Sequence, residues 1–207
     1  MPTIWGRASS INVQKVLWCC GELGLAIERR EAGREFGATD TLAYCALNLN
    51  GLVPTLVEED GFSLRESNVI VRHLCARHGM GGLCPADGRA RFDVERWMDW
   101  QATVFWPSLR PLFFGLVRTP EAERDPAALA ASHRDAAGAL AILDAHLADR
   151  AHVGGEAFTM GDIPVGVAAH RWFALPIDGP DVRHLARWYG QLAARPAFAA
   201  HVGLPLT

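Results

Sequence analysis

The sequence divides into two parts with different patterns of apolar residues. Residues 1–77 alternate short segments typical of strands with segments typical of helices, whereas residues 89–207 have helical patterns nearly throughout. The stretch between them, HGMGGLCPADGRA at 78–90, is rich in Gly and contains a Pro, a composition that interrupts regular structure. We therefore predict an α/β domain at 1–78, a linker at 79–88 and an all-helical domain at 89–207.

The first part contains few residues per element, and a strong turn signal lies near its middle. Asp60-Gly61 stands between two apolar runs and is typical of a hairpin. Gly24 and Gly79 are suited to end the two longer helices. The expected elements are a strand at 3–5, a helix at 11–24, a strand at 26–32, a weak helix at 40–47, strands at 55–58 and 62–64, and a helix at 67–78.

The second part begins with a helix at 89–106 that is apolar on more than one face. Such a helix must be covered on more than one side, either by the core and the other domain or by a second subunit, and we predict a homodimer. Further helices are expected at 127–149 and 181–194. Between them, Thr159-x-x-Asp162 is typical of a helix start with a capping box.

Composition excludes several classes of protein. The formal net charge of −3 gives no basic surface for nucleic acid, and no apolar run approaches the ~20 residues that would span a membrane. Five cysteines without a CxxC spacing indicate reduced thiols, and the eight histidines lie in no metal-binding spacing. We expect a cytoplasmic protein without a metal ion.

The stretch GRASSINVQK at 6–15 places two hydroxyls and an amide where the first helix begins. One reading is that a serine caps the free N–H groups of the helix. The other is that these N–H groups, the helix dipole and the side chains stabilise a bound anion. A thiolate would suit such a place.

Two more positions have both a structural and a functional reading. Pro54 opens a strand, so Val53-Pro54 is either a plain turn or a cis turn that holds the main chain of Val53 open to an extended peptide. Glu66-Ser67 begins the next helix, either as a cap or as a site for a ligand with a carboxylate and an ammonium group. A thiol, peptide groups and an amino-acid head together describe glutathione.

The sequence resembles the cytosolic glutathione transferases along its whole length. The resemblance lies in Ser9-Ser10-Ile11-Asn12, in NLNGLVPTLVEEDG followed by LRESNVIVRHL, in TMGDIPVG, and in ARPAF at 194–198. It implies a thioredoxin-like domain of order βαβαββα followed by an all-α domain. It also implies glutathione as co-substrate, with no metal.

The resemblance implies roles for the residues of the first domain. Val53, before Pro54, resembles the residue that pairs with the cysteinyl part of glutathione, and Glu66 and Ser67 resemble the pair that holds the γ-glutamyl group. The position where many members have Lys or Gln is Leu52 here. The glycine carboxylate would then be held by another residue, for example one of the 33–48 segment or Asn50.

Thiol activation is expected at the first helix. Ser10 resembles the activating hydroxyl of serine-type and nu-like members, and Asn12 matches the asparagine two positions beyond it. Ser9 is the alternative to Ser10. Cys19 and Cys20 lie too far along the helix to act as the cysteine of glutaredoxin-like members.

The electrophile is expected to bind between the domains. Five aromatic residues are candidates for an apolar pocket, although any single aromatic residue of this kind is more often a core residue: Trp106, Phe113, Phe114, Trp172 and Phe173. The leading hypothesis is conjugation of glutathione to small apolar electrophiles. The alternatives are a glutathione-dependent disulfide reductase or peroxidase, and a non-catalytic module of the same fold.

Overall fold

The first part of the chain is built on a four-stranded mixed sheet. In the computed structural model, which describes all 207 residues, the strand order is β2-β1-β3-β4. The parallel pair β1 and β2 places Ile4 opposite Arg29, and the antiparallel pair β1 and β3 places Ile4 opposite Leu56. Strands β3 and β4 form the predicted hairpin. The strands are β1 (Thr3–Trp5), β2 (Glu28–Arg30), β3 (Thr55–Val57) and β4 (Ser63–Arg65).

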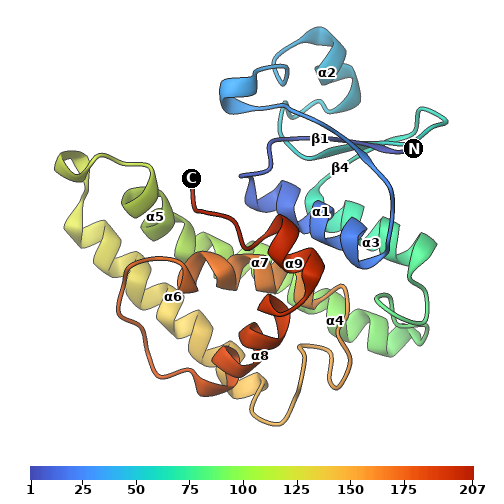
Figure 1. Cartoon of the computed structure of the whole chain (residues 1–207). Coiled ribbons are helices and arrows are strands. Elements are labelled where there is room, and N and C mark those ends of the chain that lie inside the picture. Colours follow the sequence, from blue (N-terminus) through green and yellow to red (C-terminus); the bar gives the residue numbers. More distant parts are fainter.

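Three helices complete this domain. Helices α1 (Ile11–Glu22) and α3 (Ser67–His78) lie on one side of the sheet, and α2 (Leu42–Leu47) lies on the other, after the short turn η1 (Arg34–Phe36) (Figure 1). The order is therefore βαβαββα, and the predicted thioredoxin-like fold is confirmed.

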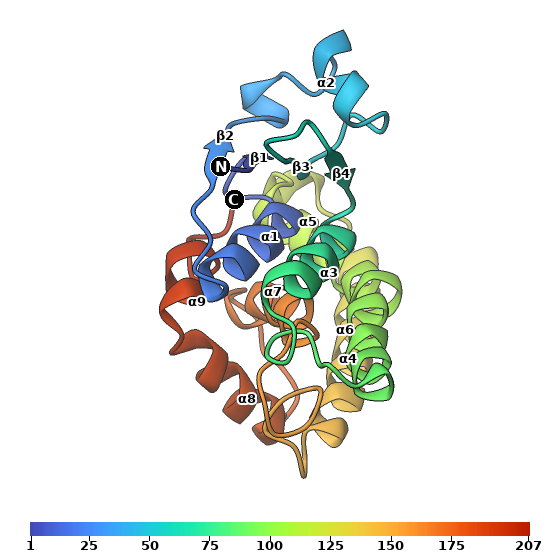
Figure 2. The same ribbon diagram turned by 90° about the vertical axis from the view of Figure 1, so that its right-hand side faces the viewer.

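All the regular elements of the second part are helices, as predicted, and this part packs against the side of the first domain that carries α1 and α3 (Figure 2). The positions of the domain boundaries stay a prediction. None of the helices has the length and apolar character that crossing a bilayer requires. The elements are α4 (Gly88–Trp100), η2 (Gln101–Phe105), α5 (Trp106–Val117), η3 (Glu121–Glu123), α6 (Pro126–His146), α7 (Asp162–Phe173), α8 (Arg183–Ala193) and α9 (Pro196–His201).

The helix expected at 89–106 runs on to Val117, through a wide turn at its middle. Residues Gln101–Phe105 form a π-helix between α4 and α5. Pro107 lies in the first turn of α5 and has no N–H, so the regular hydrogen bond back to Thr103 cannot form. The π-helical turn at this point accommodates the missing hydrogen bond. It also rotates the side chains of α5 about the helix axis relative to those of α4.

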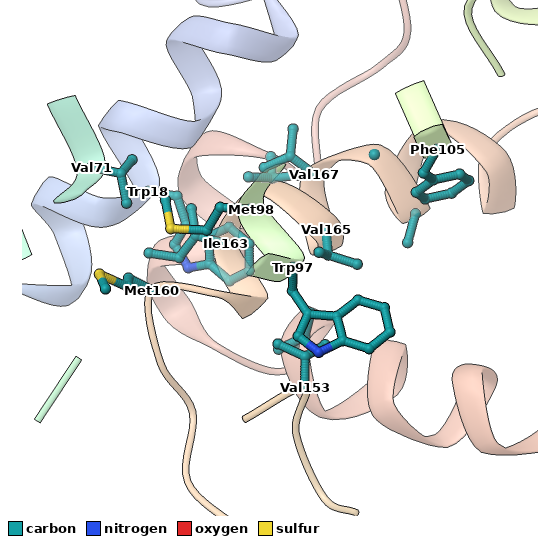
Figure 3. Close-up of a cluster of buried hydrophobic side chains, with 14 of the residues drawn as sticks. Trp18, Val71, Trp97, Met98, Phe105, Val153, Met160, Ile163, Val165 and Val167 are labelled. Atoms are coloured by element: carbon teal, nitrogen blue, oxygen red, sulfur yellow. The ribbon is translucent and has the colours of Figure 1, made fainter. Parts of the chain in front are cut away.

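The two domains share one hydrophobic core. Eight consecutive residues of α1, Val13–Cys20, are buried, which means that the helix is covered on every side. Figure 3 shows Trp18 of α1 and Val71 of α3 beside Met98 and Ile163 of the helical domain. The domains therefore form one rigid frame around whatever lies at the start of α1.

The predicted capping segment at the start of α7 is anchored by one buried carboxylate. Asp162 is fully buried and accepts hydrogen bonds from the main-chain N–H of Val153 (3.0 Å) and of Thr159 (2.9 Å). The Thr159 hydroxyl and the Trp188 indole N–H also donate to it, at 3.2 and 2.8 Å. One side chain thus fixes the loop before α7 and the position of α8.

Replacing Asp162 with Ala is expected to destabilise the protein by about 3–5 kcal/mol, because several buried donors lose their partner at once. Urea unfolding followed by circular dichroism measures the loss. Asp149→Ala is the matched control, since Asp149 is exposed and pairs only with its neighbour Arg150. An Asp162→Ala variant as stable as the control would contradict this account.

Candidate functional site

A cavity of about 500 Å³ opens between the two domains. Its walls come from the start of α1, the loop around η1, the loop before β3, helix α5 and one residue of α7. The lining residues are Arg7, Ser9, Ser10, Ile11, Asn12, Gly33, Arg34, Thr39, Gly51, Leu52, Val53, Trp106, Arg110, Phe113, Phe114, Arg118 and Arg171.

Ser10 is the N-cap residue of α1, but its hydroxyl does not cap the helix. Its carbonyl accepts the first helical bond, from the N–H of Gln14, and its backbone is extended. The N–H groups of Ile11 and Asn12 find no backbone acceptor. The structural reading of the serine pair as a cap is therefore excluded for Ser10, and the hydroxyl and the helix end both face the cavity.

Asn12 joins the starts of α1 and α3. The Ser67 hydroxyl donates to Asn12 Oδ1 at 3.2 Å, so the two helix N-termini are held together. Glu66, which precedes Ser67, has φ 67°, in the left-handed region that a non-glycine residue rarely occupies. Asn50 Nδ2 donates to Glu66 Oε1 at 3.4 Å. Such a backbone at the mouth of a helix is typical of a functional site.

The Val53-Pro54 bond is cis, which resolves the alternative that the sequence left open. The carbonyl of Leu52 accepts from the Tyr44 hydroxyl (2.7 Å) and from Asn48 Nδ2 (2.8 Å). The main chain of Val53 makes no backbone hydrogen bond and lines the cavity. It is therefore free to pair with an extended ligand.

Arginine is the residue type that sequence reasoning missed. Five arginines line the cavity and no acidic residue does: Arg7, Arg34, Arg110, Arg118 and Arg171. None of the five forms an ion pair with a side chain. They come from four separate segments, so no local motif in the sequence brings them together.

The charges in the cavity act on one another. Burial, followed by the repulsion of Arg34, Arg7 and Arg110, lowers the pKa of Arg118 to about 10. Burial and the charge of Arg118 lower the pKa of Arg171 to about 10 as well. The only acid that counteracts this near Arg118 is Glu35. The cavity is therefore an unbalanced positive site, suited to anions.

Three of the five predicted aromatic residues line the cavity: Trp106, Phe113 and Phe114. The other two do not. Trp172 faces α6, with its ring 5.2 Å from that of His133. Phe173 stacks on Tyr189 of α8 at 4.5 Å. Both rings pack on neighbouring helices, because α7 is buried from Asp162 to Trp172 and Phe173 is partly buried at its end.

No cysteine lines the cavity. Cys19 and Cys20 lie buried within α1, as expected, and Cys19 Sγ is 3.5 Å from Cys75 Sγ. The hydrogen bond between Cys19 and Cys75, together with burial, raises the pKa of Cys19, and burial raises the pKa of Cys20 to about 12. Such thiols stay protonated and are poor nucleophiles. No group of three possible metal ligands occurs in the structure.

A buried polar layer supports the start of α1 from below. Gln14 Oε1 accepts from Arg171 Nη2, and Lys15 Nζ donates to Gln101 Oε1 at 2.8 Å. Both pairs join the first domain to the second. Burial lowers the pKa of Lys15 to about 7, while the nearby Glu66 opposes the shift.

The fold and the cavity together define a class of protein. A thioredoxin-like domain is joined to a helical domain, and helix N-termini, a cis proline and cationic side chains lie around the cleft that the two domains share. Residues 5–82 match the family model "Glutathione S-transferase, N-terminal domain", and residues 98–196 match "Glutathione S-transferase, C-terminal domain". The chain belongs to the glutathione S-transferase family, and the predicted enzyme class, a glutathione transferase, is confirmed.

Individual relatives agree over the full length of the chain. Glutathione S-transferase GstB of Escherichia coli is 40% identical over 208 residues, covering 100% of both chains. Glutathione S-transferase 3 of Zea mays is 31% identical, over 98% of this chain and 94% of its own. The theta class glutathione S-transferase of Xanthomonas axonopodis pv. citri, solved with glutathione bound, is 47% identical in sequence. Its structure matches with a TM-score of 0.96, over 100% of this chain and 99% of its own.

Lys15 should make stability depend on pH. Below pH about 7 it is protonated in both states, and between about 7 and its ordinary value of 10.5 only the unfolded chain keeps the proton. The unfolded chain then binds more protons, so this group makes stability rise with pH in that window, by at most about 1.4 kcal/mol per unit. Urea unfolding of the parent and of Lys15→Met across the window measures the difference. Parallel curves for the two proteins would refute the assignment.

Proposed function

We propose that this chain binds glutathione in the cavity between its domains and that Ser10 stabilises the thiolate for attack on an electrophile. The observation that carries this proposal is the unbonded Ser10 hydroxyl at the open N-terminus of α1. A donor of this kind contributes about 1.5–3 kcal/mol to a charged partner, and the helix end adds a favourable dipole. Together they lower a thiol pKa from ~8.5 to below neutrality.

Asn12 is proposed to act beside Ser10. Its Oδ1 is held by the Ser67 hydroxyl, which fixes the side chain and leaves the amide Nδ2 as a second donor. Ser9 also lines the cavity and is the alternative donor. The buried position of Ser10, 6% exposed, favours it, because hydrogen bonds to a charge are stronger away from water.

The remaining parts of glutathione fit the other walls of the site. The free main chain of Val53, held by the cis Pro54, is proposed to pair with the cysteinyl residue. The start of α3 at Ser67 would take the γ-glutamyl carboxylate, and Glu66 its ammonium group. These roles agree with the left-handed backbone of Glu66, a conformation that costs free energy and persists at binding sites.

Arg34 is proposed to hold the glycine carboxylate in place of the residue that Leu52 replaces. It belongs to the 33–48 segment, lines the cavity and has no acidic partner. Asn50, the other candidate, already donates to Glu66. An arginine binds a carboxylate with two parallel hydrogen bonds, which makes it well suited to this end of the tripeptide.

The reaction is a nucleophilic substitution or addition. The thiol proton leaves to solvent as glutathione binds, and the thiolate sulfur forms a new bond to an electrophilic carbon. In a substitution, the leaving group departs with the bonding pair. Disulfide reduction is not favoured, and no cysteine lines the cavity to take part in it. A chloronitrobenzene acceptor and hydroxyethyl disulfide, assayed in parallel, separate the two activities.

Ser10→Ala is expected to raise the pKa of bound glutathione by about one to two units, and to lower kcat/KM at neutral pH about 10- to 100-fold. Ultraviolet absorbance of the thiolate, titrated in the complex, measures the pKa directly. Ser9→Ala is the matched control and should have a smaller effect, while Ser10→Thr keeps a hydroxyl. A thiol pKa that Ser10→Ala leaves unmoved would show that another group is the donor.

We also propose that the protein is a cytoplasmic homodimer, as is usual in this family. Large apolar side chains are exposed near α3 and α4: Phe62, Val69, Phe92 and Val104. Phe92, on the helix that the sequence predicted to be apolar on several faces, is 70% exposed. A surface of this kind is suited to a partner subunit.

Phe92→Asp is expected to shift the mass in solution from dimer toward monomer, because the new charge would have to be buried at the interface. Light scattering at micromolar concentration measures the mass. Leu42→Asp is the control, since Leu42 is 92% exposed on α2, which lies on the opposite side of the sheet from α3 (Figure 1). A monomeric parent protein would refute the proposal.

A further inference from the structure

The cavity carries more positive charge than glutathione can match. Glutathione with an ionised thiol would bring two negative charges into it, the thiolate and the glycine carboxylate. Five guanidinium groups line the walls. The γ-glutamyl head belongs to Glu66 and Ser67, neither of which lines the cavity. Cationic groups therefore remain unmatched when glutathione is in place.

Two of these arginines lie on the side where the electrophile must enter. Arg110 comes from α5, and its guanidinium carbon lies 4.9 Å from the centre of the Phe114 ring. Arg171 comes from α7 and is 3% exposed. Its Nε and Nη1 atoms are buried without any hydrogen-bond partner, although the residue lines the cavity. Only Nη2 has a partner, Gln14, and a buried guanidinium with one hydrogen bond is costly unless a ligand completes it.

Two of the other three arginines already have a partner, proposed or observed. Arg34 is the proposed partner of the glycine carboxylate. Arg118 donates to the main-chain oxygen of Thr207 at 3.1 and 3.3 Å, and it lies over the rings of Phe113 and Phe114. Arg110 makes no hydrogen bond or ion pair within the chain and is exposed. It is the cation most available to a substrate.

Arg110 also lines a second hollow that adjoins the main cavity. This second hollow, of about 510 Å³, lies along the outer side of α5. It shares Trp106, Arg110 and Phe114 with the main cavity. Two of these shared side chains are aromatic and one is a guanidinium, which together suit a planar ring with an attached anion.

We propose that the acceptor substrate is an aromatic electrophile that carries its own carboxylate, with Arg110 as the residue that determines this specificity and Arg171 as a second contact. The inference deepens the proposed function and rests on it. The thiolate sulfur attacks the ring carbon and forms a C–S bond, while the carbon–halogen bond breaks and the halide leaves with the electron pair. The inference thereby narrows the small apolar electrophile expected from the sequence to one whose aromatic ring also carries a carboxylate.

The test compares two acceptors that differ by one charge. One is a chlorodinitrobenzoate with its chlorine para to the carboxylate, and the other is the uncharged primary amide of the same acid. For each, kcat/KM at saturating glutathione is divided by the rate constant of the uncatalysed reaction, which removes the difference in intrinsic reactivity. We expect the normalised value to favour the carboxylate by about tenfold or more, as for a charge-assisted hydrogen bond.

Variants assign the preference to a residue. Arg110→Gln should reduce the ratio of the two normalised values severalfold, whereas Arg110→Lys, which keeps the charge without the planar fork, should retain part of it. Arg134→Gln removes one exposed positive charge on α6, outside the cavity, and should leave the ratio unchanged.

The possible results distinguish a failure of the substrate assignment from a failure of the proposed transferase function. Equal normalised rates for the two acceptors would overturn the inference and leave the transferase function standing. A preference that survives Arg110→Gln intact would overturn the assignment to Arg110. Turnover of neither acceptor by protein that binds glutathione would overturn the proposed function, and the inference with it.

Discussion

Helix α1 has to be covered on every side, because eight consecutive residues, Val13–Cys20, are buried and two of them, Gln14 and Lys15, are polar. The sheet and α3 cover part of it, and α7 and α9 cover the rest. Its N-terminus cannot then move independently of either domain. The cavity, the cis turn before β3 and the start of α3 are all placed relative to this one helix end. A site that depends on the direction of a hydroxyl requires such rigidity.

The polar side of that buried helix carries much of the contact between the domains. Gln14 meets Arg171, and Lys15 meets Gln101 across the interface. Glu22 forms an ion pair with Arg195 at the far end, with an N–O distance of 2.6 Å. Buried pairs of this kind add less to stability than apolar contacts would, but they allow only one relative placement of the two domains.

Much of the fold was predictable because it follows from local pattern. Each predicted element of the first domain exists, and the hairpin at Asp60-Gly61 forms as its turn residues require. The sequence also indicated the helix starts at Ser10 and Ser67. It could not show that Gln14 and Lys15 are buried, since isolated polar residues on an amphipathic helix normally face solvent. The π-turn before Pro107 was equally hidden, because a proline there is compatible with an ordinary kink.

The positive charge of the cavity was likewise not predictable from local sequence pattern. Aromatic residues in the second domain could be proposed from their type alone, and the structure separates those of α5 from Trp172 and Phe173. The five arginines are spread from Arg7 to Arg171 in a chain of net charge −3, so composition conceals them. Only the tertiary fold gathers them around one cavity, two from the first domain and three from the second.

The layer beneath α1 has one practical consequence. Lys15 is the sole lysine of the chain, since the other basic side chains are all arginines, and it is 3% exposed. Amine-reactive labels can therefore modify the folded protein only at its N-terminal amino group. A second label is added when the domains separate enough to uncover Lys15. Counting labels by mass thus reports interface opening in solution without any engineered probe.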